Sequence, residues 1–210
     1  MPQASVAQLF EYHRERLQLL RVSGNLDAPI TINQLHASPA DLVGHFNLVH
    51  PDRIQVIGAP EINWASKQHS IRVTRHMEEI IAAHPPAVIV ADGCPIPAHV
   101  REACEKSETA LFSTPESAAI VIDLLRIWLS RQLAETVELH AVMMDVLGMG
   151  VLITGDSGVG KSELALELIS RGHGLVADDI VEIARVSPNT LEARCPPMLK
   201  DFLEVRGLGV

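Results

Sequence analysis

Short apolar runs of strand length alternate along the chain with segments whose apolar positions recur at helical spacing. In the first half, strands are predicted at 54–58, 87–91 and 109–112, and helices at 5–22, around 77–81 and at 100–106. The Pro85-Pro86 pair must end the second of these helices, because proline cannot continue one. Alternation of strands and helices predicts a small α/β sheet of the parallel type.

A longer helix is predicted at 116–133, with Pro115 in its first turn and Thr114 as the N-cap. Its apolar residues nearly encircle it, so we expect burial against both halves of the chain: Ile120, Leu124, Leu125, Ile127, Trp128 and Leu129. The domain boundary is expected within 130–137, which gives an α/β domain at 1–132 and a second domain at 133–210. The first domain carries no chemical motif, and its role is undefined.

Residues 155–162, Gly155-Asp156-Ser157-Gly158-Val159-Gly160-Lys161-Ser162, fit the phosphate-loop pattern G-x-x-x-x-G-K-[ST] at every fixed position. An apolar run at 151–154 precedes them, and apolar residues at helical spacing follow them as far as Gly172. The glycines allow positive φ and bring backbone N–H groups close to a phosphate, and the helix start adds its positive dipole end. Lys161 can neutralise β- and γ-phosphate charge, and the Ser162 hydroxyl can hold Mg²⁺. The alternative is a glycine-rich turn with a solvated lysine, but the flanking strand and helix favour nucleotide binding.

A β-hairpin is predicted before the loop, with apolar strands at 139–147 and 150–154 around a glycine turn. A tight register places Leu147 opposite Gly150 and Asp145 opposite Leu152. Continuing the count brings His140 level with Ser157, so a titratable imidazole reaches the nucleotide site. The alternative is a histidine at a strand end that faces solvent.

A further strand at 174–177 runs directly into Asp178-Asp179. Because a strand–helix–strand unit is parallel, this strand should end at the same sheet edge as the phosphate loop. Two carboxylates there can serve Mg²⁺ and act as a base towards an acceptor hydroxyl. Strand alternation predicts that one of them faces the phosphates and the other a neighbour, without saying which. The alternative is a turn with two solvated acids.

The remaining sequence predicts strands at 181–186 and 190–193 around a turn at 187–189. In the final segment, Glu204 and Arg206 alternate with apolar residues, so both can project to one face of a strand. One of them could bind a metal ion and the other a phosphate.

Composition and charge limit the function classes. The chain of 210 residues has 47% hydrophobic residues, 20% charged residues and a net charge of −9, which argues against nucleic-acid binding and against affinity for an anionic membrane. It has neither a membrane-length apolar run nor a signal peptide, so we expect a cytoplasmic protein. Cys94, Cys104 and Cys195 suit reduced thiols. The ten histidines lack zinc-site spacing and are interpreted as surface or capping residues.

Together these motifs resemble the bacterial HPr kinase/phosphorylase family. The resemblance is strong from 140 to 210 and looser before that, and it is carried by His140, 145–154, 155–163, 165–168, 171–173, 176–179 and 203–209. It implies a carboxykinase-like α/β kinase core that phosphorylates a serine of the carrier protein HPr from ATP. The same site would remove that phosphate with inorganic phosphate, giving pyrophosphate, in the regulation of carbon metabolism.

The resemblance also implies residue roles. Ser162 and Glu204 would bind Mg²⁺, Lys161 would bind phosphate, and Asp179 with Asp178 beside it would be the base and, in reverse, the acid. His140 would support the site, and Arg206 belongs to the matching terminal segment.

Members of this family continue for about a hundred residues past the Leu-Glu-Val-Arg-Gly-Leu-Gly segment, a length that completes a domain. We therefore expect this chain to lack the C-terminal part, which puts its activity and the family's hexameric assembly in question. Two other function classes stay open. One is a different phosphoryl-transfer enzyme on a carboxykinase-like core, and the other is a non-catalytic nucleotide-sensing module.

Overall fold

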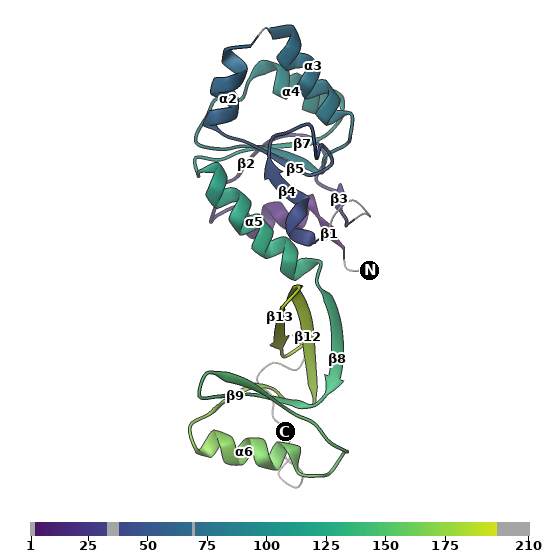
Figure 1. Ribbon diagram of the computed structural model, residues 1–210, viewed down its shortest axis with the longest axis vertical. Coiled ribbons are helices and arrows are strands. Elements are labelled where there is room, and N and C mark those ends of the chain that lie inside the picture. Colours follow the sequence, from purple (N-terminus) through teal and green to yellow (C-terminus); the bar gives the residue numbers. More distant parts are fainter. Residues whose placement is uncertain (1–2, 33–37, 69, 197–210) are drawn as a thin grey trace. The chain divides into compact units, whose positions relative to one another are not determined.

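The chain folds into two compact units, Met1–Leu133 and Ala134–Val210 (Figure 1). The computed structural model describes residues 3–32, 38–68 and 70–196. Each unit combines helices with strands, so the predicted α/β fold class is confirmed.

A five-stranded sheet forms the centre of the first unit, in the order β2-β7-β6-β5-β4. Its strands are β2 (Leu20–Ser23), β4 (Val43–His45), β5 (Ile54–Ile57), β6 (Ala87–Val90) and β7 (Ala110–Ser113). β4, β5, β6 and β7 are mutually parallel, whereas β2 pairs antiparallel with β7 at the edge. The predicted parallel sheet is therefore present, with one antiparallel edge strand added.

Helices cover both faces of this sheet, because successive side chains of the buried strands point to opposite sides. On one face, Ile89 and Phe112 pack with α1 (Val6–His13) and α5 (Ala118–Gln132). On the other, Val88 and Leu111 pack with α3 (Ser70–Ile81) and α4 (Ala98–Lys106). α2 (Ala59–Ser66), the 3-10 turn η1 (Pro39–Leu42) and a small pair of strands, β1 (Ala4–Ser5) and β3 (Pro29–Ile30), complete the unit.

The predicted helix at 5–22 is wrong in its second half. α1 ends at His13, turns follow, and Gln18 takes a positive φ of 48°, which no helix accommodates. The chain then enters β2, whose backbone pairs with β7. Leu9 and Leu17 are both fully buried. The apolar spacing therefore predicted which residues are buried, but they do not belong to one continuous helix.

The start of α5 also differs from the prediction. Ser117 is the N-cap, and its side chain accepts a hydrogen bond from the Ile120 backbone N–H. Thr114 instead donates its hydroxyl to the Leu17 carbonyl, which ties the end of β7 to the segment before β2. Ile120 and Ile127 are exposed, so α5 has a solvent face and is not buried all round.

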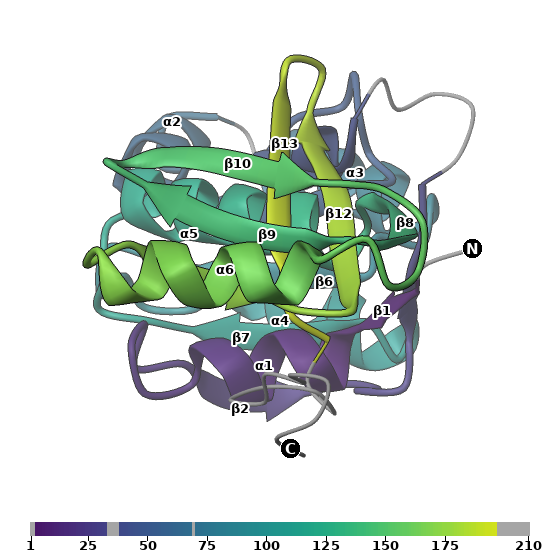
Figure 2. The ribbon, with the colours of Figure 1, turned by 90° about the horizontal axis from the view of Figure 1, so that it is seen from below.

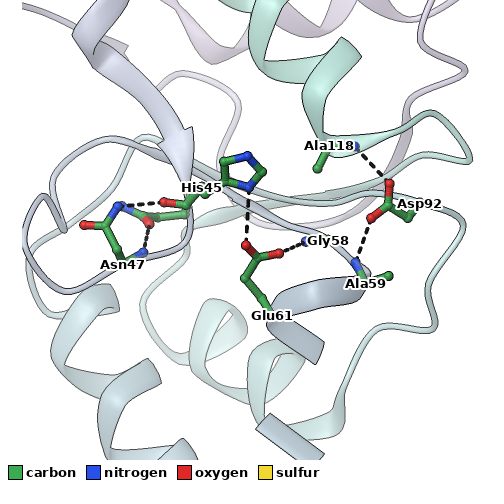
Figure 3. A network of polar contacts seen from close by, with 8 residues as sticks. His45, Asn47, Gly58, Ala59, Glu61, Asp92 and Ala118 are labelled. Atoms are coloured by element: carbon green, nitrogen blue, oxygen red, sulfur yellow. Dashed lines mark hydrogen bonds and ion pairs between the residues drawn. The ribbon is translucent and has the colours of Figure 1, made fainter. Parts of the chain in front are cut away.

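One carboxylate links the starts of two helices in the first unit (Figure 3). The two oxygens of Asp92, which directly follows β6 and Ala91, accept hydrogen bonds from the backbone N–H groups of Ala59 at 2.7 Å and Ala118 at 3.0 Å. These N–H groups belong to the first turns of α2 and α5, where no intrahelical acceptor exists. A Cβ on Gly58 would come within 2.6 Å of the same carboxylate, so this position requires glycine.

Over residues 134–196, the second unit consists of two three-stranded antiparallel sheets and one helix. One sheet has the order β10-β9-β11, from β9 (Val142–Val146), β10 (Met149–Ile153) and β11 (Gly174–Ala177). The other has the order β13-β12-β8, from β8 (Glu135–His140), β12 (Ile180–Ser187) and β13 (Thr190–Arg194). α6 (Lys161–Ser170) lies beside β9 (Figure 2). Ala165 of this helix packs in one buried cluster with Val142 and Met144 of β9.

Since β10 and β11 both run antiparallel to β9, they are parallel to each other with β9 between them. The carboxyl ends of β10 and β11 therefore lie at the same edge of the sheet, as the sequence predicts. Among the described residues, no helix has both the length and the apolar composition that a membrane crossing requires.

His13 makes the stability of the first unit depend on pH. It is 2% exposed, neither ring nitrogen has a hydrogen-bond partner, and its ring packs edge-on against Trp128 at 5.8 Å. Burial, with a smaller contribution from Arg16, lowers the pKa of His13 to about 4. Between pH 6.5 and about 4, the unfolded chain binds a proton that the folded chain excludes.

We expect the free energy of unfolding to fall by about 3 kcal/mol through this residue as the pH drops from 7 to 4. Urea denaturation followed by the fluorescence of Trp64 and Trp128, both in the first unit, measures the upper part of this loss between pH 7 and 5. His13→Phe keeps a buried ring without a titrating group and should flatten the dependence. An equally steep pH dependence in this variant would contradict the assignment.

Candidate functional site

The predicted phosphate loop connects β10 to α6, and its glycines take the backbone conformations that only glycine adopts readily. The φ angles of Gly155, Gly158 and Gly160 are 152°, 83° and 101°. Gly160 is the N-cap of α6, and Gly172 follows the C-cap with a φ of 90°. The loop therefore presents backbone N–H groups together with a helix N-terminus, an arrangement suited to a phosphate.

Lys161 is the first residue of α6, and its side chain curls back over the loop. Its Nζ donates hydrogen bonds to the carbonyl oxygens of Gly155 at 2.9 Å and Asp156 at 3.0 Å. The ammonium group is thus held by the same backbone that would surround a bound phosphate.

Ser162 and Asp178 meet at the edge of the sheet. The Ser162 hydroxyl donates to Asp178 Oδ1 at 3.1 Å, and Asp178 is only 5% exposed although it carries a carboxylate. It directly follows β11, so the parallel arrangement of β10 and β11 brings it to the first turn of α6. A hydroxyl and a buried carboxylate this close are a pair of oxygen ligands of the kind that Mg²⁺ prefers.

Asp179 lies beside Asp178 but points to a different partner. Its φ of 68° is left-handed, which ends the strand alternation before β12 begins. Its Oδ1 lies 3.1 Å from Nδ1 of His140, and both side chains are about half exposed. The two carboxylates therefore have different partners, and both of them line one pocket. Which of them faces the phosphates stays a prediction.

His140 reaches this pocket by a route that the sequence prediction missed. The hairpin turn is Leu147-Gly148, both with positive φ, so Gly150 lies opposite Asp145 and Leu152 opposite Met143. The predicted register, with Asp145 opposite Leu152, is therefore wrong. The chain bends at Ala141, and His140 belongs to β8 in the other sheet, where it pairs with Ile180 of β12.

The pocket has a volume of about 230 Å³ and brings together residues from three parts of the second unit. It is lined by His140, Val142, Ser157, Gly158, Gly160, Lys161, Ser162, Glu163, Asp178 and Asp179. Gly155, Asp156 and Val159 belong to the loop but do not line it. Glu204 and Arg206, the other predicted site residues, lie outside the described residues.

The sequence analysis missed Glu163 and Val142 as lining residues. Glu163 carries a recognisable signal, because it is the acidic residue in the first turn of α6, directly after the lysine and serine of the motif. Val142 follows the bend at Ala141 and carries no such signal. Within the described residues, no group of three or more His, Cys, Asp or Glu side chains could hold a metal ion. A metal at this site would therefore be held by fewer than three such side chains, together with other oxygen ligands such as the Ser162 hydroxyl.

Comparison with known proteins identifies two matching domain models. The model described as HPr Serine kinase N terminus matches residues 4–129, and the model described as HPr Serine kinase C-terminal domain matches residues 131–210.

Individual relatives show the same pattern. The HPr kinase/phosphorylase of Azoarcus sp. (strain BH72) is 60% identical over 210 residues, which cover 100% of this chain and 67% of that protein. The protein of that name from Paraburkholderia xenovorans (strain LB400) is 58% identical over 82% of this chain and 54% of its own length. The solved structure of the Hpr(Ser) kinase/phosphatase from Coxiella burnetii matches 35% of this chain and 48% of that chain, with 41% identity and a TM-score of 0.33.

Gly160→Ala should weaken ATP binding through the backbone alone. A Cβ at this position would have Glu163 Oε2 as its nearest neighbour at 3.9 Å, so space is available, but a φ of 101° is strained for alanine. The free loop of the variant should relax out of this conformation, so restoring it on binding would cost about 1–2 kcal/mol, or roughly 5- to 30-fold in affinity. Calorimetric titration with ATP measures the effect.

Gly174→Ala is the matched control in the same unit. Its added Cβ would make an ordinary contact at 3.5 Å with Asp145, and its φ is not positive, so binding should stay at the wild-type level. Wild-type affinity in folded Gly160→Ala would rule out a phosphate held by this loop.

Proposed function

The chain belongs to the HPr serine kinase family, and on that premise we propose that its second unit transfers the γ-phosphoryl group of ATP to a serine of HPr. In reverse, the same site would transfer the phosphoryl group from phosphoserine to inorganic phosphate, giving pyrophosphate. One observation carries the proposal. The phosphate loop, the Ser162–Asp178 pair and the His140–Asp179 pair line a single pocket.

The phosphate loop would bind the β- and γ-phosphates through its backbone N–H groups and the N-terminus of α6. Lys161 would exchange its two carbonyl partners for phosphate oxygens, since both lie in the loop that surrounds them. A fixed positive charge there stabilises the charge that develops on the transferring group.

Ser162 and Asp178 would hold Mg²⁺, with Glu204 from the final segment as a further ligand. Mg²⁺ bound there would neutralise phosphate charge and orient the γ-phosphoryl group for in-line transfer. The buried carboxylate of Asp178, hydrogen-bonded to the Ser162 hydroxyl, supports this assignment. Of the two adjacent aspartates, Asp178 would then be the metal ligand.

Asp179 would be the general base. Its carboxylate is half exposed at the mouth of the pocket, where an incoming hydroxyl could reach it. In the forward direction it would accept the serine proton while the serine oxygen attacks the γ-phosphorus and ADP leaves. In phosphorolysis Asp179 would start protonated: an oxygen of inorganic phosphate would attack the phosphoserine phosphorus, and Asp179 would give its proton to the departing serine oxygen. The proton of the attacking phosphate would then restore the protonated Asp179.

His140 would orient this base through its Nδ1 contact with Asp179. Arg206 would add positive charge at the phosphates from the final segment. We also propose that the protein binds HPr and assembles as a hexamer. Both remain proposals because the chain spans 67% of the length of the Azoarcus relative. We expect the protein to act in the cytoplasm, where HPr and ATP are available.

Lys161→Ala should lower phosphoryl transfer to HPr by roughly 100-fold or more and weaken ATP binding, because one fixed charge at the transferring phosphate is lost. Transfer of ³²P from ATP to purified HPr measures the rate, using a longer version that carries the expected C-terminal continuation. Lys106→Ala, which removes an exposed lysine at the end of α4, is the control. Unchanged ATP affinity in folded Lys161→Ala would show that Lys161 does not bind the phosphates of ATP.

Asp179→Asn and Asp178→Asn should fail in different ways. Asparagine tolerates the left-handed backbone at residue 179, so that variant should fold and lose kinase and phosphorolysis activity together, by about 100-fold or more. Asp178→Asn should instead raise the Mg²⁺ concentration needed for half-maximal rate. Rate against Mg²⁺ concentration, measured in both directions, separates the two. Near-normal phosphorolysis in Asp179→Asn would show that a group other than Asp179 acts as the base.

A further inference from the structure

A second pocket lies in the first unit, remote in sequence from the phosphate loop. It has a volume of about 450 Å³ and lies among α2, α3 and α4. Ile57 ends β5 and Phe46 directly follows β4, so the pocket opens at the carboxyl ends of two parallel strands. In open α/β sheets this edge is where ligands bind, and the volume is in the range of small-molecule sites.

Apolar side chains make up most of the wall. The floor is closed by residues that are almost fully buried, among them Ile57, Met77, Ile80 and Val100. Trp64 lies at the rim, half exposed, and its ring is stacked on that of His76 with centroids 6.2 Å apart and planes inclined by 12°. The two flat rings form a wall suited to a flat or ring-shaped ligand.

The described lining of the pocket contains no lysine or arginine, and its carboxylate is already hydrogen-bonded. Glu61 is the acidic lining residue, and its two oxygens are already engaged, by the Gly58 N–H at 2.8 Å and by His45 Nδ1 at 3.3 Å (Figure 3). The side chain of Asn47 is engaged as well, donating to the His45 carbonyl at 2.8 Å and accepting from the Val49 N–H at 3.0 Å. An anion would therefore lose hydration without gaining a counter-charge, and a cation would meet only a carboxylate whose two oxygens are already engaged.

Two imidazoles remain for hydrogen bonding. Neither His76 nor His99 has a hydrogen-bond partner among the described residues, and both line the pocket. Burial lowers the pKa of His99 against a smaller opposing effect of Glu102, which favours its neutral form. A neutral imidazole has one donor and one acceptor nitrogen, so it can pair with a hydroxyl or a carbonyl group.

We propose that this cavity binds an uncharged small molecule with a flat or alicyclic ring system and one hydroxyl or carbonyl group. The apolar walls bury the rings, and His76 or His99 pairs with the polar group. This site and its ligand are independent of the nucleotide site, and the proposal stands whether or not the second unit transfers phosphate.

Three probes that share one ring system test the ligand class on the chain of 210 residues. They are 2-naphthol, which is neutral, 2-naphthoate, which is an anion, and 2-naphthylmethylammonium, which is a cation. Calorimetric titration should give saturable one-to-one binding of 2-naphthol with a Kd of roughly 100 µM, and roughly tenfold or weaker binding of both ions. No saturable binding of 2-naphthol, or equal binding of either ion, would overturn the proposal.

Variants locate the bound probe. Ala65→Phe places a ring on the α2 face that lines the pocket and should abolish 2-naphthol binding. Asn63→Phe adds the same ring to the same helix at an exposed residue outside the lining, and it should bind as the wild type does. Unchanged binding in Ala65→Phe, or equal loss in both variants, would show that the probe binds elsewhere.

A double variant tests the hydrogen-bonding group without filling the cavity. His76→Leu with His99→Leu keeps the walls apolar and removes both imidazoles. The wild type should prefer 2-naphthol to naphthalene by roughly tenfold, and the double variant should lose this preference. A preference that persists in the double variant would overturn the role given to the imidazoles.

Discussion

The left-handed backbone of Asp179 is the constraint on which the candidate phosphoryl-transfer site depends. With a φ of 68°, this residue turns the chain from β11 of one sheet into β12 of the other. The turn keeps the Asp178 carboxylate at the first turn of α6, beside Ser162, and directs the Asp179 carboxylate to His140. A residue with ordinary strand geometry would carry the second carboxylate to the opposite face of the sheet. Asp and Asn tolerate the left-handed conformation better than most residues, so an acidic residue can provide both the turn and the chemistry.

Pairing of β8 with β12 supplies the second half of the arrangement. It holds His140 opposite Ile180, one residue beyond Asp179, and the Ala141 N–H donates to the Asp179 carbonyl at 3.2 Å. The backbone of His140 is therefore held by its pairing with β12, and not by the hairpin that precedes the phosphate loop. The pair therefore forms where the chain passes from one small sheet to the other: Asp179 lies in the connection, and His140 ends β8.

The first unit uses a carboxylate at the same kind of sheet edge for a structural purpose. Asp92 follows β6 and hydrogen-bonds to the first turns of α2 and α5, so its charge is matched by two helix dipoles. Glu61 is likewise engaged by Gly58 and His45. With the acids at this edge already engaged, the adjacent cavity is left with apolar walls and two imidazoles. If both proposals hold, the carboxyl edges of the two units would bind different ligands: charged phosphates in one, and a neutral ring in the other.

The sequence by itself determined the local features. The strands at β5, β6, β7 and β11, the glycine conformations of the phosphate loop and the start of α6 at Lys161 all follow from patterns within a few residues. Tertiary structure decided what depends on distant partners. The end of α1 at His13 is one example, because the residues that follow pair with β7 as the edge strand β2. Tertiary structure also set the hairpin register, since the positive φ values of Leu147 and Gly148 fix the turn one position earlier than the glycine spacing suggests. His140 shows the difference most clearly: the sequence indicated that it reaches the pocket, but only its pairing with β12 decided how, because backbone hydrogen bonds between strands carry almost no signal in the sequence of either strand.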